Sequence, residues 1–397
     1  MQTTDKVLMI RPVRFSYNSQ TAVNNAFQES GIPEELSQRQ ALKEFDAYVE
    51  MLRNEGIEVM VVEDTATPHT PDSIFPNNWL SLHSADELAD AGSNLPSSAH
   101  PSSAALGAAA PGTAAPGTAA PDTAALGTAA LGTAAPSTAN PGSAAPCSRV
   151  AVLYPMFAEN RRAERRQDII EALTGAVAPS CTGDALAPSC VAAADSPDCA
   201  GAADAPSCAS AALLDLTYYE KRNLFLEGTG SLILDRNEHL AYACQSPRTC
   251  EEVLEEWSSK MGYDYFLFHA EDMNGNPIYH TNVMMSVGEQ LAVVCLDAIT
   301  DIEERMSLIE LLEESDKEIV EISLEQMNEF AGNMLQLHTV KEGELKYIMV
   351  MSARAKDSLD QDQIEAIEKY CKIVAPDLEF IERNGGGSAR CMLAEIF

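Results

Sequence analysis

The sequence predicts an α/β protein built from about five repeats of strand, strand, helix and strand. A short polar or glycine-containing motif that runs into alternating aliphatic residues occurs five times: NNWLSL (77–82), EGTGSLIL (227–234), HTNVMMSV (280–287), GNMLQL (332–337) and SARCMLAEI (388–396). Between the motifs, apolar strand segments and helical segments follow in a constant order. A repeat of about 50 residues that mixes strands with a helix predicts a radial or solenoidal assembly.

The motifs are evenly spaced along the chain. The interval is 53 residues from Glu227 to His280 and 53 again from His280 to Asn333. From Asn333 to Cys391 it is 58 residues. We therefore expect these four residues to hold matching positions in successive repeats.

Two low-complexity tracts explain the one irregular interval, which is 149 residues from Asn78 to Glu227. The tracts cover 93–149 and 175–212, and without them about 54 residues remain. Both are rich in Ala, Pro, Gly, Ser and Thr and lack the large apolar side chains that offset chain entropy, so we expect disordered loops. The chain then forms a single domain over 1–397, interrupted by these two inserts.

The segments after each motif predict further strands and helices. LAYACQ (240–245) and LAVVCLDAI (291–299) are apolar enough to form the second strand of their repeats. Capping-box patterns place helices near 250–260, 301–315 and 360–371. The pattern residues are Thr249 with Glu252, Thr300 with Glu303, and Ser358 with Gln361.

Charge and cysteine content limit the partners and the compartment. The chain has 60 acidic and 26 basic residues, a formal charge of −34 that repels phosphate backbones and anionic membranes. We expect no nucleic-acid or membrane partner, because no signal peptide or 18-residue apolar run occurs either. Five of the ten cysteines fall in the low-complexity tracts, which favours a reduced, cytoplasmic protein over a disulfide framework. The sequence leaves a homo-oligomer open.

The matched motif positions predict an active site. If the repeats close into a ring, the polar residues that begin the motif strands meet at one central mouth. These residues are Asn78, Glu227, His280, Asn333 and Cys391. The glycines at 385–387 can take positive φ and approach a ligand closely.

Three of these residues have the chemistry of a cysteine hydrolase. Cys391 would be the nucleophile, His280 would stabilise its thiolate and carry protons, and Glu227 would orient the imidazole and keep it basic. Taken singly, each could equally be an inert core cysteine, a satisfied polar residue or a surface charge. Their matched spacing and the adjacent glycines favour catalysis.

Four segments resemble the motifs of the pentein superfamily: PDSIFPNNW (71–79), LEGTGSLILD (226–235), YHTNVMM (279–285) and NGGGSARCM (384–392). The group includes arginine deiminases, dimethylarginine hydrolases, amidinotransferases and citrulline-utilising hydrolases. The resemblance implies a five-bladed α/β propeller in which Cys391 attacks the guanidino or ureido carbon, without cofactor or metal. His280 would then shuttle protons, supported by Glu227.

The same resemblance implies substrate contacts. Asp72, Asn77 and Asn78 fall where dimethylarginine hydrolases carry an acidic cluster that contacts the substrate. Arg248 resembles the arginine that holds the substrate's α-carboxylate in arginine deiminases. We expect a small amino acid as the ligand.

Departures from the family pattern bear on the substrate. Arginine-specific relatives carry carboxylates where this chain has Asn78, Gly230 and Asn282, with Thr229 beside Gly230. Loss of negative charge weakens the binding of a cationic guanidinium, and an amide can donate to a ureido carbonyl where a carboxylate cannot. We therefore predict that citrulline is hydrolysed to ornithine, ammonia and carbon dioxide.

Two alternatives stay open. Asp72 can still supply a carboxylate, which keeps an arginine deiminase, dimethylarginine hydrolase or amidinotransferase possible. A non-catalytic propeller that serves as a scaffold is the third interpretation.

Other features receive simpler interpretations. We expect the basic run RRAERR (161–166) to be the solvated face of a helix. Two patterns suggest a metal-binding site only weakly, because neither HExxH nor paired CxxC spacing occurs. They are cysteines 181, 190, 199 and 208, spaced nine apart, and His269 beside acidic residues.

Overall fold

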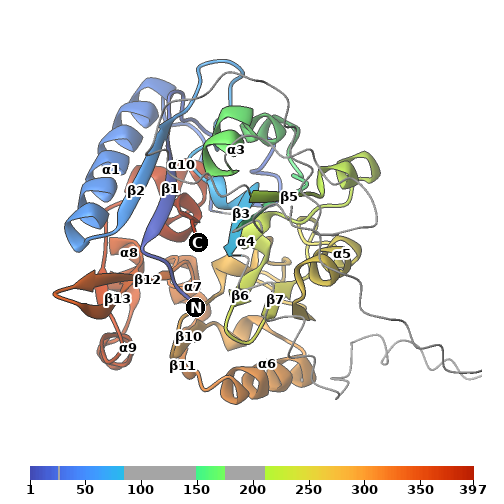
Figure 1. The fold of residues 1–397 in the computed structure, drawn as a ribbon, viewed down its shortest axis with the longest axis vertical. Helices are drawn as coiled ribbons and strands as arrows, with labels where there is room; N and C mark the ends of the chain where they lie inside the picture. Colours follow the sequence, from blue (N-terminus) through green and yellow to red (C-terminus); the bar gives the residue numbers. More distant parts are fainter. Residues whose placement is uncertain (26, 85–148, 175–210) are drawn as a thin grey trace, which may run out of the picture.

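The computed structural model describes residues 1–25, 27–84, 149–174 and 211–397 (Figure 1). Most of the two low-complexity tracts, for which we predicted disorder, lies outside these residues. The cysteines spaced nine apart lie outside them as well. The predicted tract boundaries need a correction at their ends. Residue 149 belongs to strand β4 (Arg149–Leu153), and residues 211 and 212 belong to β5 (Ala211–Asp215).

The described residues form five separate three-stranded sheets. The first is β15 (Ala394–Glu395), β1 (Lys6–Arg11) and β2 (Glu58–Glu63); the second is β3 (Leu80–Ser84), β4 and β5; the third is β6 (Ile233–Asp235), β7 (Leu240–Cys244) and β8 (Asp264–Phe268); the fourth is β9 (Met285–Val287), β10 (Leu291–Val294) and β11 (Glu318–Glu321); the fifth is β12 (Leu335–Lys341), β13 (Glu344–Val350) and β14 (Lys372–Val374). The mixed α/β class is as predicted, and none of these sheets closes on itself.

Every sheet has the same internal order. The strand that follows the sequence motif pairs antiparallel with the next strand, which pairs parallel with a third. The first sheet takes its motif strand β15 from the end of the chain and its other strands from the beginning. Because a parallel pair needs a crossover connection, each second and third strand are joined by helical segments.

The crossover helices cover the outside of the sheets, with the strands toward the centre (Figure 1). They are α1 (Glu34–Glu55), α3 (Gln167–Thr174), α5 (Glu251–Met261), α6 (Ile302–Glu314), and α8 (Ala353–Ser358) with α9 (Gln361–Glu368). Two further helices, α7 (Leu324–Asn328) and α10 (Glu379–Gly385), precede β12 and β15. The three helices predicted from the sequence are confirmed as α5, α6 and α9.

The prediction of which residues cap those helices was wrong. Helix α5 begins after Cys250 without a side-chain cap, and α6 begins after Asp301, whose carboxylate accepts from two backbone amides. Helix α9 begins after Asp360, whose amide donates to the Gln363 side chain at 2.8 Å. Several polar residues precede each helix, and a pattern match alone does not select the one whose backbone turns first.

Consecutive sheets pack against one another through their motif strands. Strand β15 lies beside β3, β6 beside β9, and β9 beside β12. The fifth sheet meets the first where the His338 amide donates to the Thr4 carbonyl at 3.1 Å. Several methionines are buried in the hydrophobic core: Met284, Met285, Met334, Met351 and Met392.

Short turns precede the motif strands and carry the polar motif residues. They are η1 (Pro76–Asn78), α4 (Gly228–Ser231), η5 (Thr281–Val283) and η7 (Ala389–Met392), while Gly332 and Asn333 form the corresponding bend before β12. Asn78 and Cys391 lie within such turns, Glu227 and His280 immediately before them, and Asn333 just before β12, so these residues occupy the same region of their repeats but not identical positions.

None of the helices in the described part of the chain is both long and apolar enough to cross a membrane.

Candidate active site

Cys391 lies in the η7 turn immediately before β15 and is 6% exposed. The glycines before it are packed rather than open. A Cβ atom at Gly385 or Gly387 would come within 2.7 or 2.9 Å of the Phe75 ring. Only Gly386 has a positive φ, of 63°, and its carbonyl accepts from the Tyr279 hydroxyl at 2.9 Å. The glycine run therefore lets the cysteine loop lie close to Phe75.

The sulfur of Cys391 faces two side-chain amides. Nδ2 of Asn333 lies 3.2 Å from Sγ, and Nδ2 of Asn282 lies 3.4 Å from it. Both asparagines are buried: Asn282 lies in η5 before β9, and Asn333 precedes β12 of the neighbouring sheet. Hydrogen bonds from amide donors favour the charged form of a thiol.

His280 and Glu227 form a buried pair. Nε2 of His280 lies 2.8 Å from Oε2 of Glu227, whose other oxygen accepts from the Phe157 amide at 2.9 Å. Nδ1 of His280 has no hydrogen-bond partner among the described residues. A Cβ atom at Gly230 would come within 2.9 Å of this Nδ1, so a side chain at 230 would displace the imidazole.

Burial keeps the imidazole of this pair neutral, and the surrounding charges keep the carboxylate ionised. Burial lowers the pKa of His280 to about 4, although Glu227 opposes this. Burial alone would raise the pKa of Glu227, but Arg248, His280 and Arg161 outweigh it and lower that pKa to about 2. At neutral pH the histidine can therefore accept a proton, and the adjacent carboxylate would stabilise the imidazolium.

Asp72 lies in a buried cluster of polar side chains. Its Oδ2 accepts from Asn18 Nδ2 at 2.8 Å and from the Thr21 hydroxyl at 3.0 Å. Nε of Arg161 lies 4.0 Å from the same oxygen. Burial raises the pKa of Asp72, while Arg161 opposes that rise.

The prediction that RRAERR is a solvated face was wrong for Arg161. Its guanidinium is buried, pairs with Glu164 at 2.8 Å and donates to the Phe75 carbonyl at 3.0 Å. Residues 161–164 lie in a short 3₁₀ segment, Glu159–Glu164, rather than in a regular helix. A basic run carries no periodic signal that separates one fully buried arginine from its partly buried neighbours.

Arg248 is buried beside the histidine pair. Its Nη1 lies 3.5 Å from Oε2 of Glu227, and Nη2 donates to the Thr21 carbonyl at 2.8 Å and to Asn24. The Tyr279 ring centroid lies 4.8 Å from its guanidinium carbon. Residues 21–25, which the sequence analysis did not connect to the site, thus reach it through Arg248.

One cavity, hereafter the cysteine cavity, joins these groups. Five residues predicted as site residues line it: Asp72, Asn78, Arg248, His280 and Cys391. Glu227 lies behind His280 and contacts it directly. Asn282 contacts Sγ, whereas Asn77 and Thr229 are buried against each other, with the Thr229 hydroxyl 3.4 Å from the Asn77 carbonyl. The sequence did not point to Arg161, Thr21 or Tyr279 here, and it placed Asn333 at the predicted mouth without a chemical role.

Buried oxygen acceptors around this cavity lack hydrogen-bond partners. They are Oδ1 of Asp72, Oδ1 of Asn78 and Oδ1 of Asn282. Unmade hydrogen bonds of buried polar groups are costly and call for a ligand or water. The arrangement therefore fits a ligand group rich in N–H donors.

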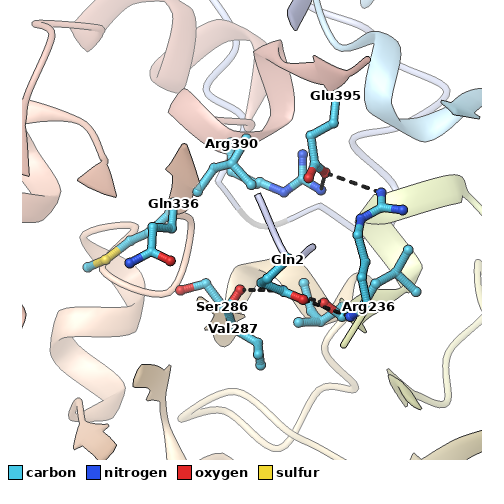
Figure 2. A pocket seen from close by; sticks show the side chains of 11 residues that line it. Gln2, Arg236, Ser286, Val287, Gln336, Arg390 and Glu395 are labelled. Atoms are coloured by element: carbon cyan, nitrogen blue, oxygen red, sulfur yellow. Dashed lines mark hydrogen bonds and ion pairs between the residues drawn. The ribbon is translucent and has the colours of Figure 1, made fainter. Parts of the chain in front are cut away.

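A second cavity, hereafter the Arg390 cavity, lies farther along the motif strands β6, β9, β12 and β15 (Figure 2). Nη2 of Arg390 lies 3.0 Å from Glu395, and Nη2 of Arg236 lies 3.9 Å from the same carboxylate. The Gln2 side chain donates to the Leu234 and Val287 carbonyls at 2.7 and 3.1 Å. The polar groups that line the Arg390 cavity therefore bind mainly one another.

No group of three or more metal-ligating side chains occurs in 1–25, 27–84, 149–174 or 211–397. His269 pairs with Glu304 at 2.9 Å on the surface.

Comparisons with known proteins place these features in a family context. The sequence model of the family described as N,N dimethylarginine dimethylhydrolase, eukaryotic, matches residues 11–90 and 143–397. No curated protein matches the chain.

Solved structures share the fold at low identity. The N-terminal domain of ArgZ, a cyanobacterial arginine dihydrolase bound to substrate as a cysteine-to-serine mutant, has a TM-score of 0.59 at 13% identity, with 98% of this chain and 97% of that chain covered. The match covers 40% of full-length apo ArgZ. The dimethylarginine dimethylhydrolase of Pseudomonas aeruginosa, complexed with citrulline, has a TM-score of 0.50 at 12% identity, with both chains fully covered.

Proposed function

Since this chain belongs to the family of eukaryotic N,N-dimethylarginine dimethylhydrolases and is a hydrolase of carbon–nitrogen bonds, we propose that it hydrolyses the ureido group of citrulline. Cys391 is the nucleophile, His280 the proton carrier and Glu227 its carboxylate partner. The products are ornithine, ammonia and carbon dioxide.

The observation that carries the proposal is the set of unpaired acceptors around the cavity that Cys391 lines. Oδ1 atoms of Asp72, Asn78 and Asn282 all lack a partner. A planar group with several N–H donors, such as a ureido or guanidino group, satisfies such acceptors while its carbon meets Sγ. An ester or thioester substrate offers no N–H donor at that position.

Charge balance favours a neutral ureido group over a guanidinium. Arg161 is paired with Glu164, and Arg248 with Glu227. Asp72 is the remaining carboxylate that lines the cysteine cavity, and burial raises its pKa. The other two unpaired acceptors are amides, which bind a cation less strongly than carboxylates do.

The proposed reaction proceeds through a covalent intermediate. Neutral His280 takes the Cys391 proton, and Sγ bonds to the ureido carbon. The carbon–nitrogen bond to one nitrogen breaks, and that nitrogen leaves with the proton from the imidazolium. Water then cleaves the carbon–sulfur bond, which restores the thiol and releases a carbamic acid. Its remaining carbon–nitrogen bond breaks on loss of carbon dioxide, which completes the products. The charge of Glu227 stabilises the transient imidazolium throughout.

Further contacts would orient the amino acid. We retain Arg248 as the contact for the α-carboxylate, because guanidinium binds carboxylate well and Arg248 lines the cysteine cavity. Asn77 and Thr229 would support the cavity wall, since neither lines the cavity. We also propose that the five sheets are blades of one propeller, supported by their identical internal order and sequential packing. A cytoplasmic location remains a prediction from charge and cysteine content.

A second candidate is hydrolysis of arginine or methylarginine. It is favoured by the unpaired oxygen of Asp72, which would bind a guanidinium strongly if ionised, and by the family description. One solved structure of the N-terminal domain of ArgZ is covalently bound to a reaction intermediate, which supports covalent chemistry for either substrate.

The deciding experiment is a substrate panel with purified enzyme. Citrulline, arginine, monomethylarginine and asymmetric dimethylarginine are supplied separately, and ornithine, citrulline, ammonia and amines are quantified. Ornithine formed from citrulline faster than any product from the other three supports the proposal. Turnover of arginine or methylarginines without ornithine from citrulline favours the second candidate, and inactivity on all four favours a scaffold.

A further inference from the structure

The Asn333 side chain is held in one orientation by two backbone groups. Its Oδ1 accepts from the Arg390 amide at 3.0 Å, and its Nδ2 donates to the Asn282 carbonyl at 2.9 Å. A backbone N–H can only donate and a backbone carbonyl can only accept, so the amide cannot be flipped without breaking both bonds. The remaining N–H of Nδ2 is directed at Cys391 Sγ, 3.2 Å away.

The same side chain ties three motif turns together. Asn282 belongs to η5 before β9, Asn333 precedes β12, and Arg390 lies in η7 beside the cysteine. Gly332 makes the approach possible, since a Cβ atom there would come within 2.3 Å of the Val283 carbonyl oxygen. The donor is therefore fixed by main-chain atoms, and it does not depend on a mobile side chain.

The other buried cysteines have fewer donors at sulfur. The Thr281 hydroxyl lies 3.6 Å from Cys244 Sγ, and Gln336 is the side-chain partner of Cys371. Burial raises the pKa of Cys244 to about 12 and that of Cys371 to about 11. Cys391 is also buried, and it is the one described cysteine whose sulfur lies beside two asparagine amides. Donors directed at sulfur offset the cost of burying a thiolate.

We propose that Asn333 is a further catalytic residue, whose Nδ2–H holds the sulfur of Cys391 as a thiolate and fixes its direction of attack. The inference rests on the proposed role of Cys391 as nucleophile. It does not depend on which amino acid is the substrate. Asn333 binds no substrate atom in this role, so its removal changes kcat far more than KM.

The test measures thiolate formation without substrate. Wild type and Asn333→Asp are alkylated with iodoacetamide from pH 5 to 10, and the Cys391 peptide is quantified by mass spectrometry beside the Cys244 and Cys371 peptides. Aspartate keeps an acceptor for Arg390 but places an oxygen against the sulfur. We expect the midpoint pH of Cys391 alkylation to rise by about one unit or more, with roughly tenfold slower labelling at neutral pH.

Two further variants keep the test decisive. Asn333→Ser, which retains a donor, should give a smaller rise, and it replaces the aspartate variant if that one does not fold by circular dichroism. Asn384→Asp is the matched control, because Asn384 is buried near the cysteine loop and donates to Ser37 rather than to sulfur. Its alkylation profile should equal that of wild type.

An unchanged midpoint in folded Asn333→Asp overturns the proposal. A shift of the same size in Asn384→Asp does so too, since the effect would then be general loosening of the loop. The alkylation measurement would remain valid if the citrulline assay failed, because alkylation requires no turnover.

Discussion

Arg390 and Cys391 are neighbours in the chain, yet they line two different cavities. In the Arg390 cavity the charged groups are paired, with Glu395 shared between Arg390 and Arg236. Ser286 Oγ and Gln336 Nε2 are unpaired there, but no carboxylate oxygen lining that cavity is. In the cysteine cavity the unpaired atoms are oxygen acceptors, including one of Asp72.

The difference indicates that the two cavities have different roles: one stabilises the fold, and the other can bind a ligand. Paired charges stabilise the packing of strands, because a buried charge without a partner is costly. Unpaired acceptors of one kind beside a nucleophile form a site that only a donor-rich ligand completes. Variants in the two cavities should therefore differ: activity should be lost in the cysteine cavity, whereas in the Arg390 cavity stability should be lost with the chemistry kept.

The largest effect is expected from Cys391→Ser in the cysteine cavity. Serine is nearly the same size but a far weaker nucleophile, so kcat should fall by roughly 10³-fold or more. The melting temperature should change little, and citrulline should still bind by calorimetry. Appreciable turnover by this variant would remove the covalent step from the mechanism.

Glu227→Gln should have the next largest effect. Without its charge the imidazolium loses stabilisation, and we expect kcat to fall by about 10²-fold. Arg248 also loses its buried partner, so the free energy of unfolding should drop by about 3 kcal/mol. Both are measured by steady-state kinetics and urea unfolding.

The matched control is Glu304→Gln, which breaks the exposed pair with His269. An exposed pair contributes less than about 1 kcal/mol, and kinetics should be unchanged. Equal losses in the two variants would contradict a special role for Glu227.

Asp72→Asn tests the charge of the cysteine cavity and should act selectively. If a neutral ureido group is the substrate, kcat/KM for citrulline should change only a few-fold. Any residual activity on arginine should fall by about tenfold more, because a carboxylate binds guanidinium more strongly than an amide does. The ratio of kcat/KM values for the two amino acids is the measurement, and a larger loss on citrulline than on arginine would reverse the substrate assignment.

The smallest kinetic effect is expected from Glu395→Gln in the Arg390 cavity. Two arginines would share a neutral amide, and the free energy of unfolding should fall by about 2 kcal/mol. The kcat/KM of the folded enzyme should stay within about threefold of wild type. A loss of activity as large as that of Glu227→Gln would show that the two cavities are not functionally separate.

Much of the architecture could be predicted from the sequence. The 53-residue spacing of Glu227, His280 and Asn333 located matching turns, because each repeat must place its motif strand in the same position of its sheet. Apolar segments such as LAYACQ located second strands for a similar reason, since a buried strand needs a continuous apolar run.

The rest depended on contacts between remote segments. Arg161 lies in a basic run that has no inward-facing periodicity, and Thr21 belongs to an N-terminal segment without a repeat signal. Their positions follow from packing against Asp72 and Arg248, which the local sequence does not encode. The helix caps were misplaced for a related reason: several polar residues compete, and the chain direction at the first turn selects one.

By itself, the sequence determined which residues occur at similar places in successive motifs. They are the cysteine, histidine, glutamate and asparagines that lie shortly before each motif strand. Only the tertiary structure decided which atoms of those residues meet, that Asn333 is directed at the sulfur while Arg390 is directed away from it, and which acceptors are left unpaired. The physical reason is that periodicity fixes a residue's place along a strand, whereas hydrogen-bond geometry depends on distances of a few tenths of an ångström between segments far apart in the chain.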